Sequence, residues 1–537
     1  MKLMGHRAIN SSASWLAMVL IGALLVSPGW AVASSTTASG NGDSVSADFN
    51  GDGYGDLAVG VQEGVDGAAD AGAVNVIYGS TRGLSADGDQ FWTQNSPGIA
   101  DVAEEEDFFS WWLSSADFNG DGFGDLAAGA GGEDVGDVAD AGAVHVIYGS
   151  RGGLSAAGDE FLTQDSPGIA DVAENADCFG CTTGGGDFNG DGFADLLVGV
   201  QAEDVAGAED AGAVHVIYGG EDGLSPAGSQ LWSQDSPGVS DVAEEGDNFG
   251  WAFATREFGK DDHVDLAVAA PFEDVGAPPD AGAVHVLFGS ADGLSAGDDQ
   301  LWTQDSPGIQ DSAEEGDWFG YSLVAADFQQ STHAELAIAA PGEDVGGAED
   351  VGIVNVINGS AGGLTAAGDQ VWWQGSAAET GDFFGDSLAA ANFGRGHHVD
   401  LAVGADGEDV GEINGAGAVD VFYGSRRGLS ADGHQFWTQD TAGVAGHVEL
   451  VDDELGEGFG YLLLAVNFGR SDQADLAATV PGESIGQVQG AGGVNVLYGS
   501  RDGLTAQGDQ FWSQDSPGIK DTAEKFDFLG TFTGAPT

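Results

Sequence analysis

The chain has 537 residues with 88 acidic and only 13 basic side chains, which gives a formal net charge of −75. A surface this negative repels nucleic acid and anionic lipid and keeps a protein in solution, so we expect a monomer that binds no nucleic acid. Three Ca2+ ions would offset only six of these charges, so we attribute the acidity to solubility or to salty surroundings, with a basic partner as the alternative.

The N-terminus predicts secretion. Lys2 and Arg7 precede an apolar run over residues 15–26, and a small-residue motif follows and ends at Ala33. This pattern is typical of a signal peptide, here residues 1–33, that is cleaved after Ala33. The apolar run is too short for a permanent anchor, and no later stretch is apolar enough for a membrane helix, so we expect no membrane insertion.

A nine-residue loop occurs in three copies, DFNGDGYGD from Asp48, DFNGDGFGD from Asp117 and DFNGDGFAD from Asp187. Its odd positions supply carboxylate and amide oxygens, the ligands that a hard cation such as Ca2+ prefers, and glycine at position six suits the sharp turn. An EF-hand has Glu at position twelve, whereas the first copy has Val59 there, so the ninth-position Asp would complete the site. The alternative is a surface turn that binds nothing. The predicted calcium ligands are Asp48, Asn50, Asp52, Tyr54 and Asp56, then Asp117, Asn119, Asp121, Phe123 and Asp125, then Asp187, Asn189, Asp191, Phe193 and Asp195, with the aromatic residues contributing carbonyl oxygens.

Four weaker copies of the loop begin at Glu257, Asp327, Asn392 and Asn467, and each keeps an acidic residue at position nine. Seven units therefore follow one another at spacings of 69, 70, 70, 70, 65 and 75 residues. The fifth unit could form a weaker fourth metal site, since charge count tunes the affinity for Ca2+. Its ligands would be Asp327, Gln329, Ser331 and Glu335.

Each unit also contains a strand-like segment of the AGAVHVIYGS type, rich in Val, Ile and Tyr. No useful window shows a helical period, so we expect an all-β chain and a seven-bladed β-propeller. The first unit lacks the segment that precedes the loop in the second, and a matching segment appears at residues 524–534. We therefore predict that the two chain ends share a blade, and that a Ser/Thr-rich linker over 34–41 leads into one domain, 42–537.

The units resemble the FG-GAP repeat, found in the propeller of integrin α subunits and in many secreted bacterial proteins. The FG element stands as Phe179-Gly180, Phe249-Gly250 and Phe319-Gly320, and the GAP element is recognisable at Ala270-Pro271 and Ala340-Pro341. The resemblance covers almost all of the chain after the signal peptide. It implies a propeller with Ca2+ bound between FG and GAP, wherever the loop ligands are retained.

Cys178 and Cys181 form a C-x-x-C pair just before the third loop. In a secreted chain such a pair favours a disulfide, but residues three apart on a strand point to opposite faces, so a bridge requires a local turn. The pair is therefore expected to be either a local disulfide or two free thiols.

No catalytic motif is recognisable. His145, His215 and His285 occupy one repeated strand position, which predicts a polar strand face and not a triad. Carboxylates occur throughout the chain, so composition does not exclude a glycosidase-like pair. Such a pair is not located here, because catalytic residues should stand out as breaks in the repeat. A repeated Trp, exemplified by Trp92, predicts packing between blades.

These features predict a secreted, calcium-binding FG-GAP propeller without assigned catalytic residues. Its function would be adhesion to, or recognition of, an unidentified extracellular protein or glycan. The alternative is an extracellular hydrolase or lyase, acting on polysaccharide or a phospholipid-related substrate, because one fold hosts many functions.

Overall fold

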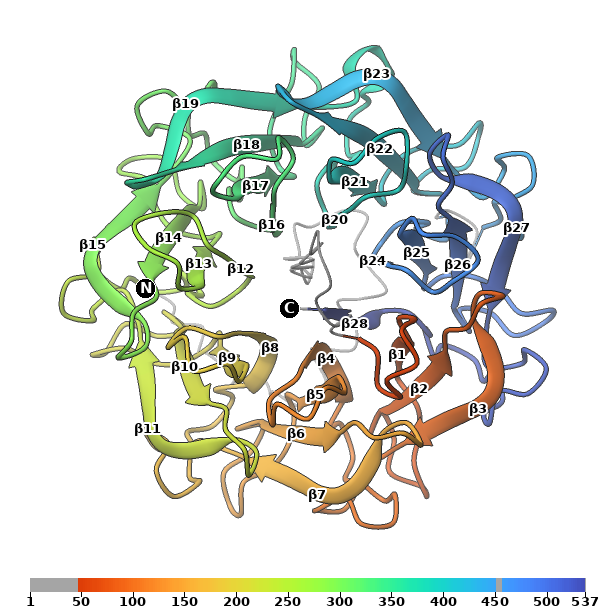
Figure 1. Ribbon diagram of the computed structural model, residues 1–537, viewed down its shortest axis with the longest axis horizontal. Coiled ribbons are helices and arrows are strands. Elements are labelled where there is room, and N and C mark those ends of the chain that lie inside the picture. Colours follow the sequence, from red (N-terminus) through yellow and green to blue (C-terminus); the bar gives the residue numbers. More distant parts are fainter. Residues whose placement is uncertain (1–46, 451–455, 537) are drawn as a thin grey trace, which may run out of the picture. The chain divides into compact units, whose positions relative to one another are not determined.

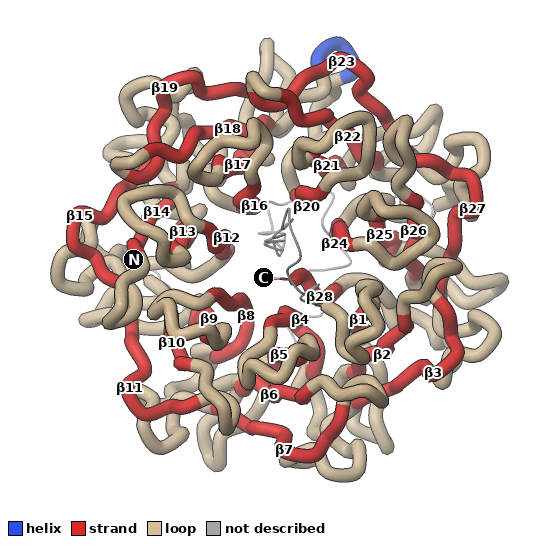
Figure 2. Tube along the Cα trace, in the orientation of Figure 1, coloured by secondary structure: helices blue, strands red, loops and turns tan. Residues whose placement is uncertain are grey.

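The computed structural model describes residues 47–450 and 456–536, and the predicted signal peptide and linker lie outside that range. Twenty-eight strands form seven four-stranded blades around a central axis (Figures 1 and 2). The described residues contain no α-helix and one 3-10 turn, Gly375–Ala377. The predicted all-β, seven-bladed propeller is therefore confirmed.

Each blade runs from an inner strand beside the axis to an outer strand, and successive strands within it are antiparallel. Blade 1 contains β28 (Phe532–Pro536), β1 (Leu57–Val61), β2 (Ala73–Tyr78) and β3 (Ser85–Trp92); blade 2 contains β4 (Phe109–Ala116), β5 (Asp125–Ala130), β6 (Ala143–Tyr148) and β7 (Ser155–Leu162); blade 3 contains β8 (Phe179–Gly186), β9 (Asp195–Val200), β10 (Ala213–Tyr218) and β11 (Ser225–Trp232). Blade 4 contains β12 (Phe253–Arg256), β13 (Asp265–Ala270), β14 (Ala283–Phe288) and β15 (Ser295–Trp302); blade 5 contains β16 (Leu323–Ala326), β17 (Glu335–Ala340), β18 (Ile353–Ser360) and β19 (Gly363–Trp372). Blade 6 contains β20 (Leu388–Ala391), β21 (Asp400–Ala405), β22 (Ala418–Ser425) and β23 (Gly428–Trp437); blade 7 contains β24 (Leu463–Val466), β25 (Asp475–Val480), β26 (Gly493–Tyr498) and β27 (Thr505–Trp512).

The last strand closes the ring, as the chain ends predicted. β28 pairs antiparallel with β1, placing Thr533 opposite Val59, and it also pairs in parallel with β4, placing Gly534 opposite Leu113. Blades 1 and 2 thereby share one eight-stranded sheet. Figure 1 shows β28 between β1 and β4 beside the axis. Closure removes a free sheet edge, which would otherwise invite pairing with another chain.

The hydrophobic core lies between neighbouring blades. β6 is buried along its whole length, and its Val144 and Val146 pack with Phe179 and Leu196 of blade 3. A strand that is buried on both faces has no need to alternate polar and apolar residues, which explains the runs of Val and Ile. The repeated Trp position contributes to the packing between blades, since Trp92 of blade 1 lies in the apolar cluster shared with blade 2. The predicted packing role of this Trp is therefore confirmed.

Candidate functional site

Each nine-residue loop leads into the second strand of its blade, from the inner strand in blades 2 to 7 and from the N-terminal side in blade 1. Each loop lies at the contact with the next blade, which we call a seam. In blade 1, the carbonyl oxygen of Asp48 accepts a hydrogen bond from Gly124 N at 2.9 Å. The carbonyl of Phe49 accepts one from Ser150 N at 3.0 Å, and both donors belong to blade 2. The loop backbone therefore joins one blade to the next.

The first acid of each intact loop folds the loop around its own carboxylate. Asp48 Oδ1 accepts hydrogen bonds from Gly51 N at 2.7 Å and Asp52 N at 3.1 Å, and its Oδ2 accepts one from Gly53 N at 2.7 Å. Asp117 and Asp187 receive equivalent bonds in blades 2 and 3. The three predicted loops therefore share one conformation.

The ninth-position acid has a structural role that the sequence interpretation missed. Asp56 is fully buried, and its two oxygens accept hydrogen bonds from Phe49 N at 2.8 Å and Gly79 N at 2.9 Å. Asp475 makes the same two bonds in blade 7, where the other loop ligands are lost. Pinning the backbone in this way explains why all seven units keep an acid here, whether or not the loop binds an ion. Comparison of the intact and weak copies could have suggested this role.

The donor set of the intact loops fits Ca2+. Burial, together with Asp48 and Asp52, raises the pKa of Asp56 to about 8, which is the effect expected for carboxylates gathered without a cation. Each carboxylate oxygen has two lone pairs, so those that accept an N–H bond can still contact a metal. As the side chains stand, residues 47–450 and 456–536 contain no group of three His, Cys, Asp or Glu residues that could hold a metal ion.

Three of the weaker loops carry a basic residue at position four, where the intact loops have glycine. Arg470 lies 3.9 Å from the centre of the Tyr498 ring and donates from Nε to the Arg82 carbonyl of blade 1 at 2.7 Å. Arg395 makes the equivalent contacts in blade 6, and Lys260 lies over Phe288 in blade 4. These cations were missed by the sequence interpretation, although the aligned fourth positions would have revealed them.

The weak fourth and fifth loops share a His–Glu contact that uses part of their ligand set. His333 Nδ1 of blade 5 lies 2.8 Å from Glu257 Oε1, the first acid of the blade 4 loop. In blade 5 itself, Ser331 N donates to Asp327 Oδ1 at 2.7 Å, and burial raises the pKa of Glu335 to about 7. Asp327, Ser331 and Glu335 therefore remain oxygen donors for the weaker fourth site, whereas Glu257 is already paired.

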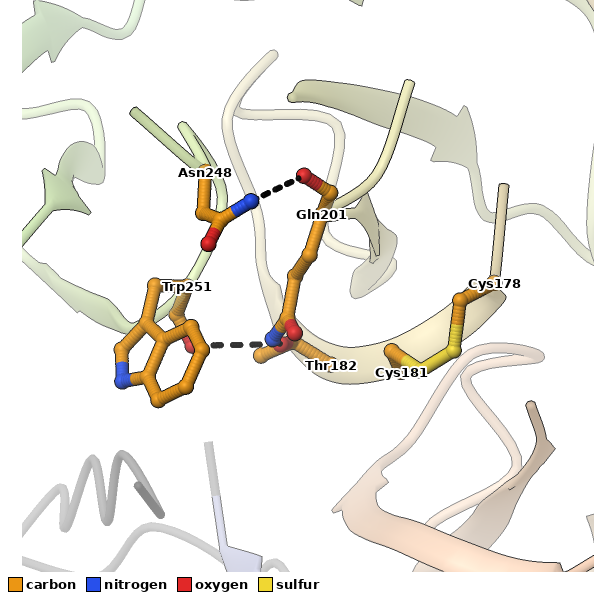
Figure 3. The surroundings of a disulfide bond; sticks show 6 residues. All are labelled: Cys178, Cys181, Thr182, Gln201, Asn248 and Trp251. Carbon is orange, nitrogen blue, oxygen red and sulfur yellow. Dashed lines mark hydrogen bonds between the residues drawn. A yellow bond between two sulfur atoms is a disulfide. The ribbon is translucent and has the colours of Figure 1, made fainter. Parts of the chain in front are cut away.

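Cys178 and Cys181 form a disulfide (Figure 3), which resolves the two alternatives left open by the sequence. The required local turn is present, since Cys181 N donates to Cys178 O at 3.0 Å and Cys178 has a φ of 63°. Blade 2 makes the same turn with an aromatic pair, Phe108 and Trp111, whose ring centres lie 4.9 Å apart. The disulfide therefore occupies a position at which another blade packs two rings.

Two acids of blade 6 break the repeat. Asp386 follows the FG element where other blades have residues such as Tyr321 and Tyr461, and Asp406 replaces the Pro of GAP. The two half-buried carboxyl groups lie close enough to interact, and burial raises the pKa of both. Burial and the proximity of Asp406 raise the pKa of Asp386 well above its usual range. Comparing the seven units column by column would have found this pair.

The repeated histidines are buried core residues. His215 and His285 are fully buried, and burial lowers the pKa of each to about 4. Each packs edge-on against the Phe of its FG element, with ring centres 5.4 Å apart. They are therefore neutral at physiological pH.

Comparisons with known proteins identify the repeat. A family model described as the FG-GAP repeat matches residues 109–147, 179–217 and 249–287, which run from the inner strand to the third strand of blades 2, 3 and 4. The match in blade 4 shows that the repeat persists where the loop has lost ligands. In the described residues, no helix is long and apolar enough to cross a membrane.

The relatives belong to different functional classes. Phosphatidylinositol-glycan-specific phospholipase D of Bos taurus is 30% identical over 223 residues, which are 41% of this chain and 25% of the relative. Integrin alpha-V of Gallus gallus is 30% identical over 234 residues, 42% of this chain and 20% of the relative. The chain thus spans about a quarter or less of these proteins. A rhamnogalacturonan lyase of Bacillus licheniformis overlaps 84% of this chain and 89% of its own, at 10% identity and a TM-score of 0.32, too low to support an argument.

Proposed function

The chain is a seven-bladed propeller that carries FG-GAP repeats, and we propose that it is a secreted, calcium-binding module that recognises an extracellular protein or glycan. One observation carries the proposal: three consecutive blades keep a complete set of loop oxygens at a seam. Ca2+ bound there would neutralise carboxylates that otherwise repel one another. The similarity to integrin alpha-V supports a recognition role.

The loops act on the seam through their own backbone. Because the carbonyls of Asp48 and Phe49 bond to blade 2, an ion that holds Asp48, Asp52 and Asp56 together would also hold the two blades in register. The blade 1 loop also packs closely against the blade 2 loop, since a Cβ added at Gly51 would lie 2.6 Å from Phe123 Cε1. Calcium in the three loops would therefore stiffen the seams that join blades 1 to 4.

The binding surface is proposed at the opposite ends of the blades. Antiparallel strands place the seam loops at one end and the acidic connections between second and third strands at the other. Asp134 and Asp137 of blade 2, and Asp204 of blade 3, are exposed in these connections. Such residues would attract a partner with basic or hydroxyl groups.

The test is a protein and glycan array probed with and without a calcium chelator. We expect calcium-dependent binding of the wild type and its loss in the Asp52→Ala, Asp121→Ala, Asp191→Ala variant. The variant Asp222→Asn, which removes one exposed carboxylate of blade 3, serves as the control. Binding to the array that is unchanged by both the chelator and the triple substitution would contradict the proposal.

A second candidate function, an extracellular hydrolase or lyase, is favoured by the Asp386–Asp406 pair. A carboxyl group with a raised pKa can act as a general acid, as in other carboxyl pairs. Turnover of a polysaccharide and phospholipid panel that disappears in Asp386→Asn, but not in Asp222→Asn, would establish this function instead.

A further inference from the structure

Six arginines lie at one end of three consecutive blades, in a chain whose net charge is −75. Blades 6, 7 and 1 follow one another around the ring (Figure 1). Antiparallel pairing places the hairpins between third and fourth strands at the same end as the seam loops. We call the six residues the arginine arc: Arg426 and Arg427 in the blade 6 hairpin, Arg501 in the blade 7 hairpin, Arg82 in the blade 1 hairpin, and Arg395 and Arg470 in the seam loops of blades 6 and 7.

Hydrogen bonds across two seams bring the loop arginines beside the hairpin arginines. Arg395 N donates to the Arg501 carbonyl at 3.1 Å, and Arg395 Nε donates to the Asp502 carbonyl at 2.8 Å. Arg470 Nε donates to the Arg82 carbonyl at 2.7 Å. Each of these seams therefore has two arginines, and the hairpin of blade 6, the preceding blade in the ring, adds two more.

The charge of the arginine arc is exposed and is not neutralised by a carboxylate. All six side chains are exposed. Within residues 47–450 and 456–536, each ion pair involves a histidine and none involves an arginine. A guanidinium has several N–H donors, and the bonds of Arg395 and Arg470 to neighbouring carbonyls leave donors available. Stacking on Tyr423 and Tyr498 holds these two groups in place.

The equivalent positions of other blades carry the opposite charge. The blade 3 hairpin has Glu221 and Asp222 where blade 6 has two arginines, and the blade 4 hairpin has Asp292. The two seam loops and three hairpins of the arc contain six arginines and two acids, Asp472 and Asp502, so their net charge with neutral His is +4. These segments are residues 79–83, 392–399, 424–428, 467–474 and 499–503. A positive region confined to three blades is not a consequence of the repeat, and it fits an anionic partner.

We propose that the arginine arc binds an acidic polysaccharide, a chain of uronic acid units, along the rim of blades 6, 7 and 1. The planar guanidinium matches a carboxylate with two parallel hydrogen bonds, and a polyuronate offers one carboxylate on each sugar. The sugar hydroxyls between the carboxylates can donate to Asp472 and Asp502, which would repel a phosphate chain. Charges elsewhere on the protein are screened beyond about 8 Å at physiological ionic strength, so a bound chain responds mainly to the arginines.

Two other anionic partners fit the arc less well. Duplex DNA carries one charge per about 1.7 Å, so its repulsion by the acidic remainder of the protein is stronger than that of a polyuronate. A second copy of the chain would bring another net charge of −75 against the first. A polyuronate is less densely charged than DNA, and its hydroxyl groups suit the two acids of the arc.

The arginine arc can be tested separately from calcium-dependent recognition. It lies at the opposite end of the blades from the acidic connections, and none of its residues is a predicted calcium ligand. Binding of polyuronate is therefore measured in chelator, which removes the calcium-dependent recognition proposed above. Each proposal can then fail while the other holds.

Calorimetric titration with polygalacturonate oligomers in chelator and at low salt measures binding to the arc. The variant Arg82→Gln, Arg426→Gln, Arg427→Gln, Arg501→Gln removes four charges at exposed turns, and circular dichroism checks its fold. We expect binding to weaken about tenfold or more, because four charge-assisted contacts are lost. Arg151→Gln removes the equivalent hairpin arginine of blade 2, which lies outside the arc, and should leave binding unchanged.

The double variant Arg426→Gln, Arg427→Gln should show a smaller loss in the same direction, which provides the test if the fourfold variant does not fold. Added NaCl should weaken binding of the wild type, and uncharged dextran should not bind. Absence of polygalacturonate binding, or equal binding by the arginine variants, would overturn the proposal. Tighter binding of duplex DNA or of phosphatidylserine vesicles would also overturn it, as would a doubled mass in light scattering that the fourfold variant abolishes.

Discussion

The seam loops of blades 1 to 3 and those of blades 4, 6 and 7 make similar backbone contacts with different charges inside. In both classes the first two loop carbonyls accept hydrogen bonds from the next blade, as Asp48 and Phe49 do in blade 1 and Asn392 and Phe393 in blade 6. The loops of blades 1 to 3, the first class, contain several carboxylates. The loops of blades 4, 6 and 7, the second class, have a Lys or Arg side chain at position four. A propeller blade can therefore lose the oxygen set without losing the seam.

Position four shows why a loop belongs to one class or the other. Gly51 has a φ of 69° and faces Phe123 of the next loop at a distance that leaves no room for a side chain. Arg395 and Arg470 keep a similar backbone, with φ of 60° and 68°, although left-handed φ is uncommon for these residues. The stacking of each guanidinium on a Tyr ring offsets that strain.

The largest expected effect concerns calcium in the first class. At a free Ca2+ concentration 100 times the dissociation constant, each occupied site stabilises the fold by about 2.7 kcal/mol, so three sites add roughly 8 kcal/mol. We expect a large rise in melting temperature on adding Ca2+ to chelated protein. The Asp52→Ala, Asp121→Ala, Asp191→Ala variant should lose most of it. An equal rise in that variant would abolish the distinction between the two loop classes.

The ninth-position acid should matter equally in both classes when calcium is absent. Asp475→Ala leaves the N–H groups of Phe468 and Gly499 buried without an acceptor, which costs about 1–3 kcal/mol per group. Asp56→Ala should cost the same in chelator and more in Ca2+. Urea unfolding of both variants measures the costs, with the exposed Asp502→Ala as control. A small loss for Asp475→Ala would mean that this acid does not hold the seam backbone as its two hydrogen bonds indicate.

The pH dependence should also depend on calcium. The folded-state pKa of Asp56 and Asp125 is about 8, well above the unfolded value, so the folded state holds these protons more tightly. Their contribution to stability is therefore fully present below about pH 4 and is lost as the pH rises to about 8. In chelator we expect the free energy of unfolding to fall across this window by about 2 kcal/mol or more. Saturating Ca2+ should flatten the slope, and an unchanged slope would contradict metal binding at these acids.

The repeat made the fold predictable but hid the departures from it. Seven spaced copies and the matching end segment at 524–534 were enough to derive the propeller and its closure. The Asp48 loop could also be recognised, because its ligands are close in sequence. The contact between Glu63 and Gln514 could not be recognised, since these residues are 451 positions apart and meet only when the ring closes. Asp386 and Asp406 could have been found by comparing equivalent positions of the seven units and looking for residues that differ from the others.

The smallest expected effect tests the built-in cation of the second class. Arg470→Met keeps an unbranched side chain over Tyr498 but removes the charge and the hydrogen bond to the Arg82 carbonyl, for an expected loss of about 1–2 kcal/mol. The loss should be the same with Ca2+ and with chelator, because Asn467 and Gly469 offer little to a metal in this loop. Arg501→Met, at an exposed turn of the same blade, should have almost no effect. If Arg470→Met instead made the stability of blade 7 respond to Ca2+, the arginine would be excluding an ion from that loop, and the two classes would be alternative states of one site.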